Sequence, residues 1–182
     1  AMTKRVGLQP LDEEYILMGM AAYGEPHYIK EMLTLLKDSV NIEFAENLHI
    51  GVSDNFLPNA NEMDIASSAQ YVAEWLIKMI MSKARDVGRS RNLVYSGGVA
   101  LNCLANRLLG DYFENIWIMP NPGDAGSSLG AAALGYGKKL NWTDAFLGYD
   151  IPGRYPVNDA LDCLVTSGVV GVASGRAEFG PR

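Results

Sequence analysis

Two glycine-rich turns hold the residue types that are best suited to binding phosphate. Gly97 and Gly98 follow the apolar run 93–96, and a Pro-Gly-Asp-Ala-Gly turn at 122–126 follows the apolar run 116–119. Consecutive residues without side chains let backbone N–H groups and a following helix N-terminus face an anion. The first turn is therefore a candidate phosphate site, and a tight turn that needs glycine for steric reasons is the alternative. Neither a G-x-G-x-x-G fingerprint nor a G-x-x-x-x-G-K-[ST] loop is present.

Two polar residues lie next to these turns. The side chain of Asn102 could bind a ribose or a base edge, or it could satisfy local backbone groups. The carboxylate of Asp124 could hold a divalent cation beside nucleotide phosphates, and its alternative role is an ordinary helix N-cap.

The remaining reactive side chains are isolated in the sequence. His27 and His49 are the only histidines, so they make no metal cluster, and each is expected at the surface or partly packed. Cys103 and Cys163 lie in apolar helical patterns and are expected to be buried thiols of a reducing, cytoplasmic compartment. No Ser/His/Asp or Cys/His arrangement can be assembled, which argues against a self-contained nucleophilic enzyme.

The elements that carry both turns alternate between strand and helix. Apolar runs predict strands at 93–96 and 116–119, and helical patterns follow each of them at 100–109 and 126–140. This order predicts parallel strands joined by right-handed crossovers in a layered α/β sheet. Both turns then lie at the carboxyl ends of strands, where such sheets bind ligands.

The flanking regions show other periods. The first half predicts, in order, a helix over 13–23 closed by a left-handed Gly24, a helix over 26–37, a hairpin of 42–44 with 48–52, and a long helix capped by Asp64 and closed at 83–85. The core stripe of the long helix is predicted to be Ile65, Ala69, Val72, Leu76 and Met79 or Ile80. Beyond a connector at 149–156, we expect a short helix capped by Asn158 and a strand over 169–173.

Composition limits the class of protein. The chain has 182 residues, of which 48% are hydrophobic, and a formal net charge of -6, from 15 Lys and Arg against 21 Asp and Glu. These values are typical of a soluble globular chain of one-domain size, and the acidic balance argues against a nucleic-acid partner. We also expect neither a membrane span nor a signal peptide.

Five blocks of sequence, in this order, resemble the O-carbamoyltransferase family, which includes nodulation-factor and antibiotic carbamoylating enzymes. The blocks are 17–26 (LMGMAAYGEP), 64–70 (DIASSAQ), 95–102 (YSGGVALN), 119–130 (MPNPGDAGSSLG) and 175–182 (GRAEFGPR). The resemblance implies an ATPase-like module of the actin and sugar-kinase superfamily, with a ribonuclease-H-like, three-layer α/β fold, joined to an adenylate-forming module. It also implies a reaction in two stages. Carbamoyl phosphate and ATP give carbamoyl adenylate, and the carbamoyl group then passes to a hydroxyl of a sugar or natural product.

The resemblance also assigns site residues. Gly97, Gly98, Val99 and Asn102 match the nucleotide-binding turn of the family, and Gly24 is expected to line the same cleft. Asp124 matches a metal-ligand aspartate, for iron or magnesium. Residues 178–182 match the motif that opens the adenylate-forming module, so Arg182 would be a phosphate or carbamoyl contact if that module follows.

The sequence also departs from the family pattern. Neither His27 nor His49 matches the two metal-binding histidines of the family, and Ile16 stands where a lysine is frequent. We therefore expect residues 1–148 to be the second half of the ATPase-like domain and 149–182 to be a connector and the start of a truncated module. Such a fragment should be inactive alone, should bind ATP weakly or not at all, and should need flanking modules of the same chain. Exposed apolar patches and a homodimer would be the expected signs that apolar surface lacks its partners.

Two other functions fit the same turns. One is a sugar or acyl kinase of the same superfamily, which a downstream adenylate-forming module would argue against. The other is a non-catalytic interaction domain, in which replacing Asp124 by alanine would leave activity in a parent complex unchanged.

Overall fold

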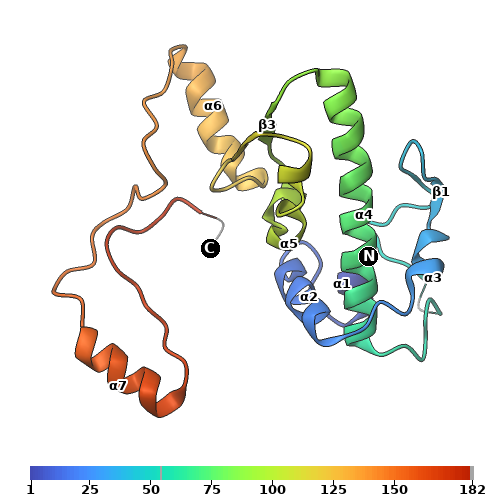
Figure 1. Cartoon of the computed structure of the whole chain (residues 1–182), viewed down its shortest axis with the longest axis horizontal. Helices are drawn as coiled ribbons and strands as arrows, with labels where there is room; N and C mark the ends of the chain where they lie inside the picture. The colour runs from blue at the N-terminus through green and yellow to red at the C-terminus, as the bar shows by residue number, and fades with distance from the viewer. Residues whose placement is uncertain (54, 181–182) are drawn as a thin grey trace. The chain divides into compact units, whose positions relative to one another are not determined.

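The computed structural model describes residues 1–53 and 55–180 (Figure 1). The chain divides into two compact units, Ala1–Ile118 and Met119–Arg182. Arg182, expected to contact phosphate or a carbamoyl group, lies outside the described residues.

The long helix α4, Glu62–Gly88, is the central element of the first unit. It is the green helix in Figure 1, with α2 (Glu14–Met20) and α5 (Cys103–Asn106) on one side and α3 (Ile29–Leu33) and β1 (Leu36–Asp38) on the other. The predicted cap, Asp64, is wrong. Asn61 caps the helix, because its Oδ1 accepts the N–H of Met63 at 2.8 Å, while the carboxylate of Asp64 binds a different segment.

The segments before α4 are short. They are α1 (Met2–Arg5), α2 (Glu14–Met20), the 3-10 turn η1 (Ala21–Tyr23) and α3 (Ile29–Leu33). The predicted helix over 13–23 is thus confirmed, with its last turn tightened. Gly24 does not take the predicted left-handed conformation, since its φ of -122° and ψ of 172° are extended.

The predicted hairpin is wrong in its pairing. Strand β1, Leu36–Asp38, pairs antiparallel with β2, Glu43–Phe44, so the partner of 43–44 precedes it instead of following it. The carboxylate of Asp38 accepts the N–H groups of Val40 and Asn41 at 2.7 and 3.1 Å. This side-chain turn reverses the chain directly after Asp38, and the preceding helix already ends at Leu33.

The predicted parallel strands are confirmed. Strand β3, Asn92–Tyr95, pairs in parallel with β4, Asn115–Ile118, and Tyr95 stands opposite Ile118. The connection between them is not the single predicted helix over 100–109. It consists of η2 (Gly98–Leu101), α5 (Cys103–Asn106) and η3 (Leu109–Asp111). Asn102 interrupts the helix because its φ of -78° and ψ of 89° are not helical.

Two apolar cores lie along α4. One contains Ile77, Met81, Ala105, Leu109 and Phe113, with the inner sides of β3 and β4 packed against it. The other contains Val6, Met32 and Ile65, with Ala69 and Val72 partly buried beside it. The predicted stripe of α4 is therefore correct in its first half and wrong in its second, where Ile77 and Met81 are buried and Ile80 is exposed.

One face of the parallel pair is open. Val94 and Trp117 are register partners, and they are 72% and 49% exposed, although parallel sheets normally have both faces covered. The described residues form a mixed α/β structure with two two-stranded sheets. The three-layer, ribonuclease-H-like arrangement stays a prediction.

The second unit contains η4 (Asp124–Gly126), α6 (Ser127–Tyr136) and α7 (Val157–Ser167). The helix predicted over 126–140 is confirmed but ends at Gly137, which has a left-handed φ of 66°. The predicted cap Asn158 is wrong, because it lies inside α7. Residues 169–173 are not a strand; instead Asp150 and Arg176 form an antiparallel bridge nearby.

Both cysteines are exposed free thiols, so the prediction of burial is wrong. Across the described residues, the structure has no helix long and apolar enough to cross a membrane.

Candidate functional site

The turn after β3 has the geometry of a backbone anion site. Gly97 has a φ of 109° and a ψ of 165°, a conformation that is essentially restricted to glycine. A Cβ placed on Gly97 or Gly98 would meet nothing within 4 Å, so the space beside the turn is open. The N–H groups of Gly98 and Val99 lie in the first turn of η2, where a helix offers no internal acceptor. These amides are available to a ligand at the carboxyl end of a parallel strand.

Asn102 uses its side chain within the protein. Its Oδ1 accepts the N–H of Ala105 at 3.0 Å, which caps α5. The same oxygen accepts Nε2 of Gln70 at 3.1 Å, and Nδ2 of Asn102 donates to Oε1 of Gln70 at 2.9 Å. The local role weighed for Asn102 from the sequence is therefore present, and its contact with a nucleotide stays a prediction.

Gln70 is a residue whose importance the sequence pattern did not reveal. Besides Asn102, its Nε2 donates to Oε1 of Glu74 at 3.0 Å, and Oε2 of Glu74 accepts Nη2 of Arg107 at 3.0 Å. This chain of polar groups ties the region after the glycine turn to α4 on both sides of α5. The segment directly after the turn is thus held by the helix.

Gly24 is required by packing. A Cβ at Gly24 would lie 2.1 Å from the carbonyl oxygen of Met63 and 2.6 Å from the nitrogen of Asp64. The next residues hold the same helix end: the N–H of Glu25 donates to Oδ1 of Asp64 at 2.8 Å, and the N–H of Tyr28 donates to Oγ of the fully buried Ser68 at 2.9 Å. The loop 24–28 therefore sits directly on the first turns of α4.

His27 and Asp64 form a pair in this loop. Nδ1 of His27 lies 3.3 Å from Oδ2 of Asp64, with the two side chains 65% and 22% exposed. The N–H of Glu25, and to a lesser extent His27, lower the pKa of the Asp64 carboxyl below its ordinary value. His27 is exposed, as predicted, but its partner, 37 residues away, could not be read from the sequence.

The first unit gathers most of the predicted site residues near one end of its sheet. Because α4 leads into β3 and runs opposite to it, the N-terminal half of α4 lies on the side where β3 ends. The Gln70–Asn102 pair joins this half of α4 to the segment after β3, and Cys103 Sγ of α5 approaches Met18 Sδ of α2 at 4.0 Å. Gly24 holds the beginning of the same helix.

Asp124 belongs to the second unit. It is exposed, and it opens η4, while the N-cap of α6 is Gly126 without a side-chain cap bond. The alternative role of Asp124 as the cap of that helix is therefore wrong. Gly126 closes the turn, since a Cβ there would lie 1.8 Å from the carbonyl oxygen of Asn121.

The described residues do not build a metal site on their own. Within 1–53 and 55–180, no group of three or more His, Cys, Asp or Glu side chains is close enough to hold a metal ion. Asp124 would supply one ligand, whereas hard cations such as magnesium take about six oxygen ligands.

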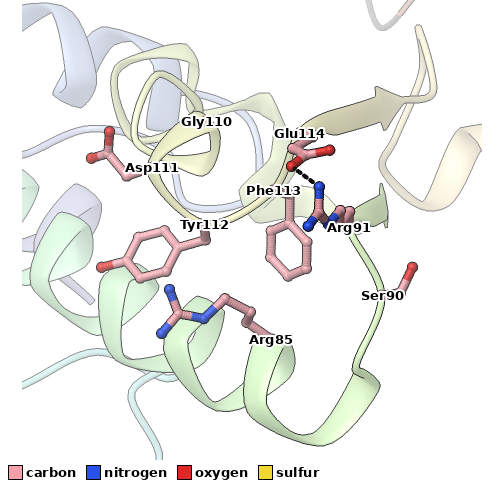
Figure 2. A pocket seen from close by; sticks show the side chains of 8 residues that line it. All are labelled: Arg85, Ser90, Arg91, Gly110, Asp111, Tyr112, Phe113 and Glu114. Carbon is pink, nitrogen blue, oxygen red and sulfur yellow. Dashed lines mark hydrogen bonds and ion pairs between the residues drawn. The ribbon is translucent and has the colours of Figure 1, made fainter.

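One cavity lies at the other end of the sheet (Figure 2). It has a volume of about 320 Å³ and is lined by Arg85, Ser90, Arg91, Gly110, Asp111, Tyr112, Phe113 and Glu114. Arg91 and Glu114, which precede β3 and β4, form an ion pair at 2.7 Å, and the guanidinium of Arg85 lies 5.9 Å from the centre of the Tyr112 ring. This cavity contains none of the predicted site residues, and its arginines already have partners.

Comparison with known proteins provides independent evidence on the family of this chain. The sequence model of the family described as "Carbamoyltransferase N-terminus" matches residues 1–133. The chain is similar to the uncharacterized protein sll1178 of Synechocystis, with 31% identity over all of this chain and 38% of that protein. It is also similar to nodulation protein NolO of Bradyrhizobium diazoefficiens, with 25% identity over 93% of this chain and 38% of the relative.

A third relative is nodulation protein U of Sinorhizobium fredii, with 25% identity over 97% of this chain and 36% of the relative. The chain thus spans less than two fifths of the length of these three relatives. The alignment with the Synechocystis protein extends over 238 positions, against 182 residues here, so that relative has additional residues inside the matched stretch.

Proposed function

The chain belongs to the carbamoyltransferase family, and from this membership we propose that it forms part of an O-carbamoyltransferase. In this proposal, a carbamoyl group passes from carbamoyl phosphate, through carbamoyl adenylate, to a hydroxyl group of a sugar or natural product. ATP is the activating substrate. The acceptor and any flanking modules of the same chain are the partners, together with a second copy in a homodimer.

One observation carries the nucleotide part of the proposal, namely the open turn after β3. The left-handed φ of Gly97 and the space beside Gly97 and Gly98 allow a phosphate to approach the backbone closely. The N–H groups of Gly98 and Val99 would then donate to phosphate oxygens, as backbone amides do at other phosphate sites. The acidic net charge of -6 does not oppose this role, because backbone amides, and not a basic surface, would hold the phosphates.

A divalent metal, iron or magnesium, is the second expected cofactor. Asp124 would hold it as one ligand, and the remaining ligands would have to come from outside the described residues, because those do not assemble a metal site. When bound, such a cation would polarise a carbonyl or phosphoryl oxygen. The exposed carboxylate of Asp124, which does not cap α6, is compatible with this role.

Carbamoyl transfer is favoured over the kinase function by the family match, which covers the glycine turn and Asp124. We retain residues 1–148 as part of the ATPase-like domain and 149–182 as a connector and the start of an adenylate-forming module. The two free cysteines support a reducing, cytoplasmic location. We further propose that the chain is inactive by itself and binds ATP weakly or not at all.

The nucleotide product tests this function. A carbamoyltransferase that acts through carbamoyl adenylate releases AMP and pyrophosphate in the presence of carbamoyl phosphate, whereas a kinase releases ADP. We expect the longer protein that contains this chain to form AMP only when carbamoyl phosphate is present. ADP formation that depends on a sugar acceptor and not on carbamoyl phosphate would support the kinase instead.

A further inference from the structure

The His27–Asp64 pair lies outside the nucleotide turn and outside the proposed metal site. Both oxygens of Asp64 are engaged: Oδ1 accepts the N–H of Glu25 at 2.8 Å, and Oδ2 faces Nδ1 of His27 at 3.3 Å. The backbone of the loop thus orients the carboxylate that faces the imidazole. A carboxylate held in this way fixes the ring of a neighbouring histidine.

The pairing selects one tautomer of His27. An ionised carboxylate only accepts hydrogen bonds, so Nδ1 of His27 must carry the hydrogen that faces Oδ2. Nε2 then keeps its lone pair and can accept a proton. Because the side chain of His27 is 65% exposed, Nε2 is accessible to a molecule arriving from solvent.

The loop that carries His27 is fixed at both ends. On one side the backbone of Gly24 rests on the carbonyl of Met63, and on the other the N–H of Tyr28 donates to the buried Oγ of Ser68. The side chain of Tyr28 also packs against the core around Ile65. An exposed imidazole is therefore held on a rigid support, which is the arrangement that proton transfer to a bound substrate requires.

The pair and the proposed nucleotide turn are both joined to the N-terminal half of α4. Asp64 precedes Gln70 by six residues, which is about 9 Å along the axis of a helix. Gln70 binds Asn102, the residue that ends the turn segment η2. A carbamoyl donor bound at Gly98 and an acceptor hydroxyl beside His27 would thus both lie on segments that are bound to the N-terminal half of α4.

We propose that His27 is the general base that takes the proton of the acceptor hydroxyl, with Asp64 as its positioning residue, and this assignment rests on the proposed carbamoyl transfer. In the step, the hydroxyl oxygen forms a bond to the carbamoyl carbon, and its proton moves to Nε2 of His27. The bond from that carbon to the leaving phosphate oxygen breaks, and its electron pair stays on that oxygen. The proton on His27 is then released to solvent or to the leaving group.

Charged and aromatic groups surround His27. Asp64 faces it from α4, Glu25 is the acidic neighbour in its own loop, and the ring of Tyr28 lies edge-on at 6.4 Å.

The test uses two nucleophiles in the longer protein that contains this chain. Glycerol at high concentration offers a hydroxyl that needs a base, while hydroxylamine is already a strong, neutral nucleophile that does not. We expect His27→Gln to slow the carbamoylation of glycerol by about 10²- to 10⁴-fold and to leave the carbamoylation of hydroxylamine within about threefold. His49→Gln, which replaces the other exposed histidine, is the matched control and should change neither rate.

Asp64→Asn separates positioning from folding. The new amide can still accept the N–H of Glu25, but its NH₂ group would face Nδ1 of His27 and favour the opposite tautomer. We expect Asp64→Asn to slow transfer to glycerol and to leave transfer to hydroxylamine normal. Equal losses with both nucleophiles, an unchanged His27→Gln, or a wild type that carbamoylates only hydroxylamine would overturn the assignment. A wild type that carbamoylates neither would overturn the proposed function itself, and the base with it.

Discussion

The side-chain amides of Gln70 and Asn102 face each other and exchange two hydrogen bonds, at 2.9 and 3.1 Å. This relationship joins the middle of α4 to the residue directly after the glycine turn. Asn102 also caps α5, so its one side chain binds both α4 and α5 directly after the turn segment. This bracing holds the residue that ends η2, the segment that carries Gly98 and Val99.

Replacing Asn102 by alanine should therefore destabilise the fold. The variant loses the cap of α5 and both hydrogen bonds with Gln70, and we expect a loss of about 1–2 kcal/mol in the free energy of unfolding. Asn102→Asp keeps both acceptor functions of the side chain and should lose clearly less. Urea denaturation measures both values, and an alanine variant as stable as the wild type would contradict the bracing role.

Gly24→Ala should be destabilising for a different reason. The new Cβ would lie 2.1 Å from the carbonyl oxygen of Met63, and neither backbone can yield without moving the loop from α4. We expect a loss of about 1–3 kcal/mol, as for overpacked sites. Gly19→Ala in α2 is the matched control: nothing lies within 4 Å of its Cβ, so alanine should stabilise by about 0.5–1 kcal/mol. Thermal unfolding of both variants checks the opposite signs.

The carboxyl of Asp64 should contribute to the loss of folding stability at acidic pH. Its pKa is lowered from the ordinary 3.8, first by the N–H of Glu25, so its ionised form favours the folded state. That contribution is present above the unfolded value and is lost as the pH falls through the folded value. Asp64→Asn should accordingly lose less stability than the wild type between about pH 5 and pH 3. The measurement is urea unfolding at several pH values, and parallel curves would show that Asp64 is not the group responsible. Asp38, whose pKa is also lowered, is present in both proteins.

Asp124→Ala should separate stability from activity. Because Asp124 is exposed and does not cap α6, its loss should change the free energy of unfolding by less than about 0.5 kcal/mol. If Asp124 is a metal ligand, carbamoyl transfer by the longer protein should nevertheless be abolished. Full activity in this variant would support a vestigial site, and marked unfolding would show that the residue is structural.

Local patterns predicted the elements that depend on local physics. The first half of the α4 stripe, the helix over 13–23 and the two apolar runs of β3 and β4 were readable, because each reports burial within one segment. The break at Asn102 was not, since a capping side chain there divides one apolar helical pattern into shorter pieces. The hairpin failed because the turn at Asp38 depends on side-chain bonds that the apolar period does not encode.

The site was predictable in part for the same reason. A double glycine after an apolar run identifies the turn at Gly97, whose left-handed φ agrees with the residue type. The roles of Gly24 and His27 depend on contacts with Met63 and Asp64, which lie far along the chain, and one sequence does not show such pairs. The exposure of the two thiols and of Val94 likewise depends on which other segments pack against them, and a single sequence does not show this.

The most direct test of the proposed function is the fate of the carbamoyl group itself. The longer protein is supplied with isotopically labelled carbamoyl phosphate, ATP and a neutral sugar such as N-acetylglucosamine, and the sugar is analysed by mass spectrometry. We expect a labelled carbamoyl ester on a sugar hydroxyl, formed only when ATP is present and greatly reduced in Gly98→Ala, whose methyl group would occupy the open space beside the turn. A phosphorylated sugar without the label, or labelled product that forms equally well without ATP, would contradict the proposed carbamoyl transfer.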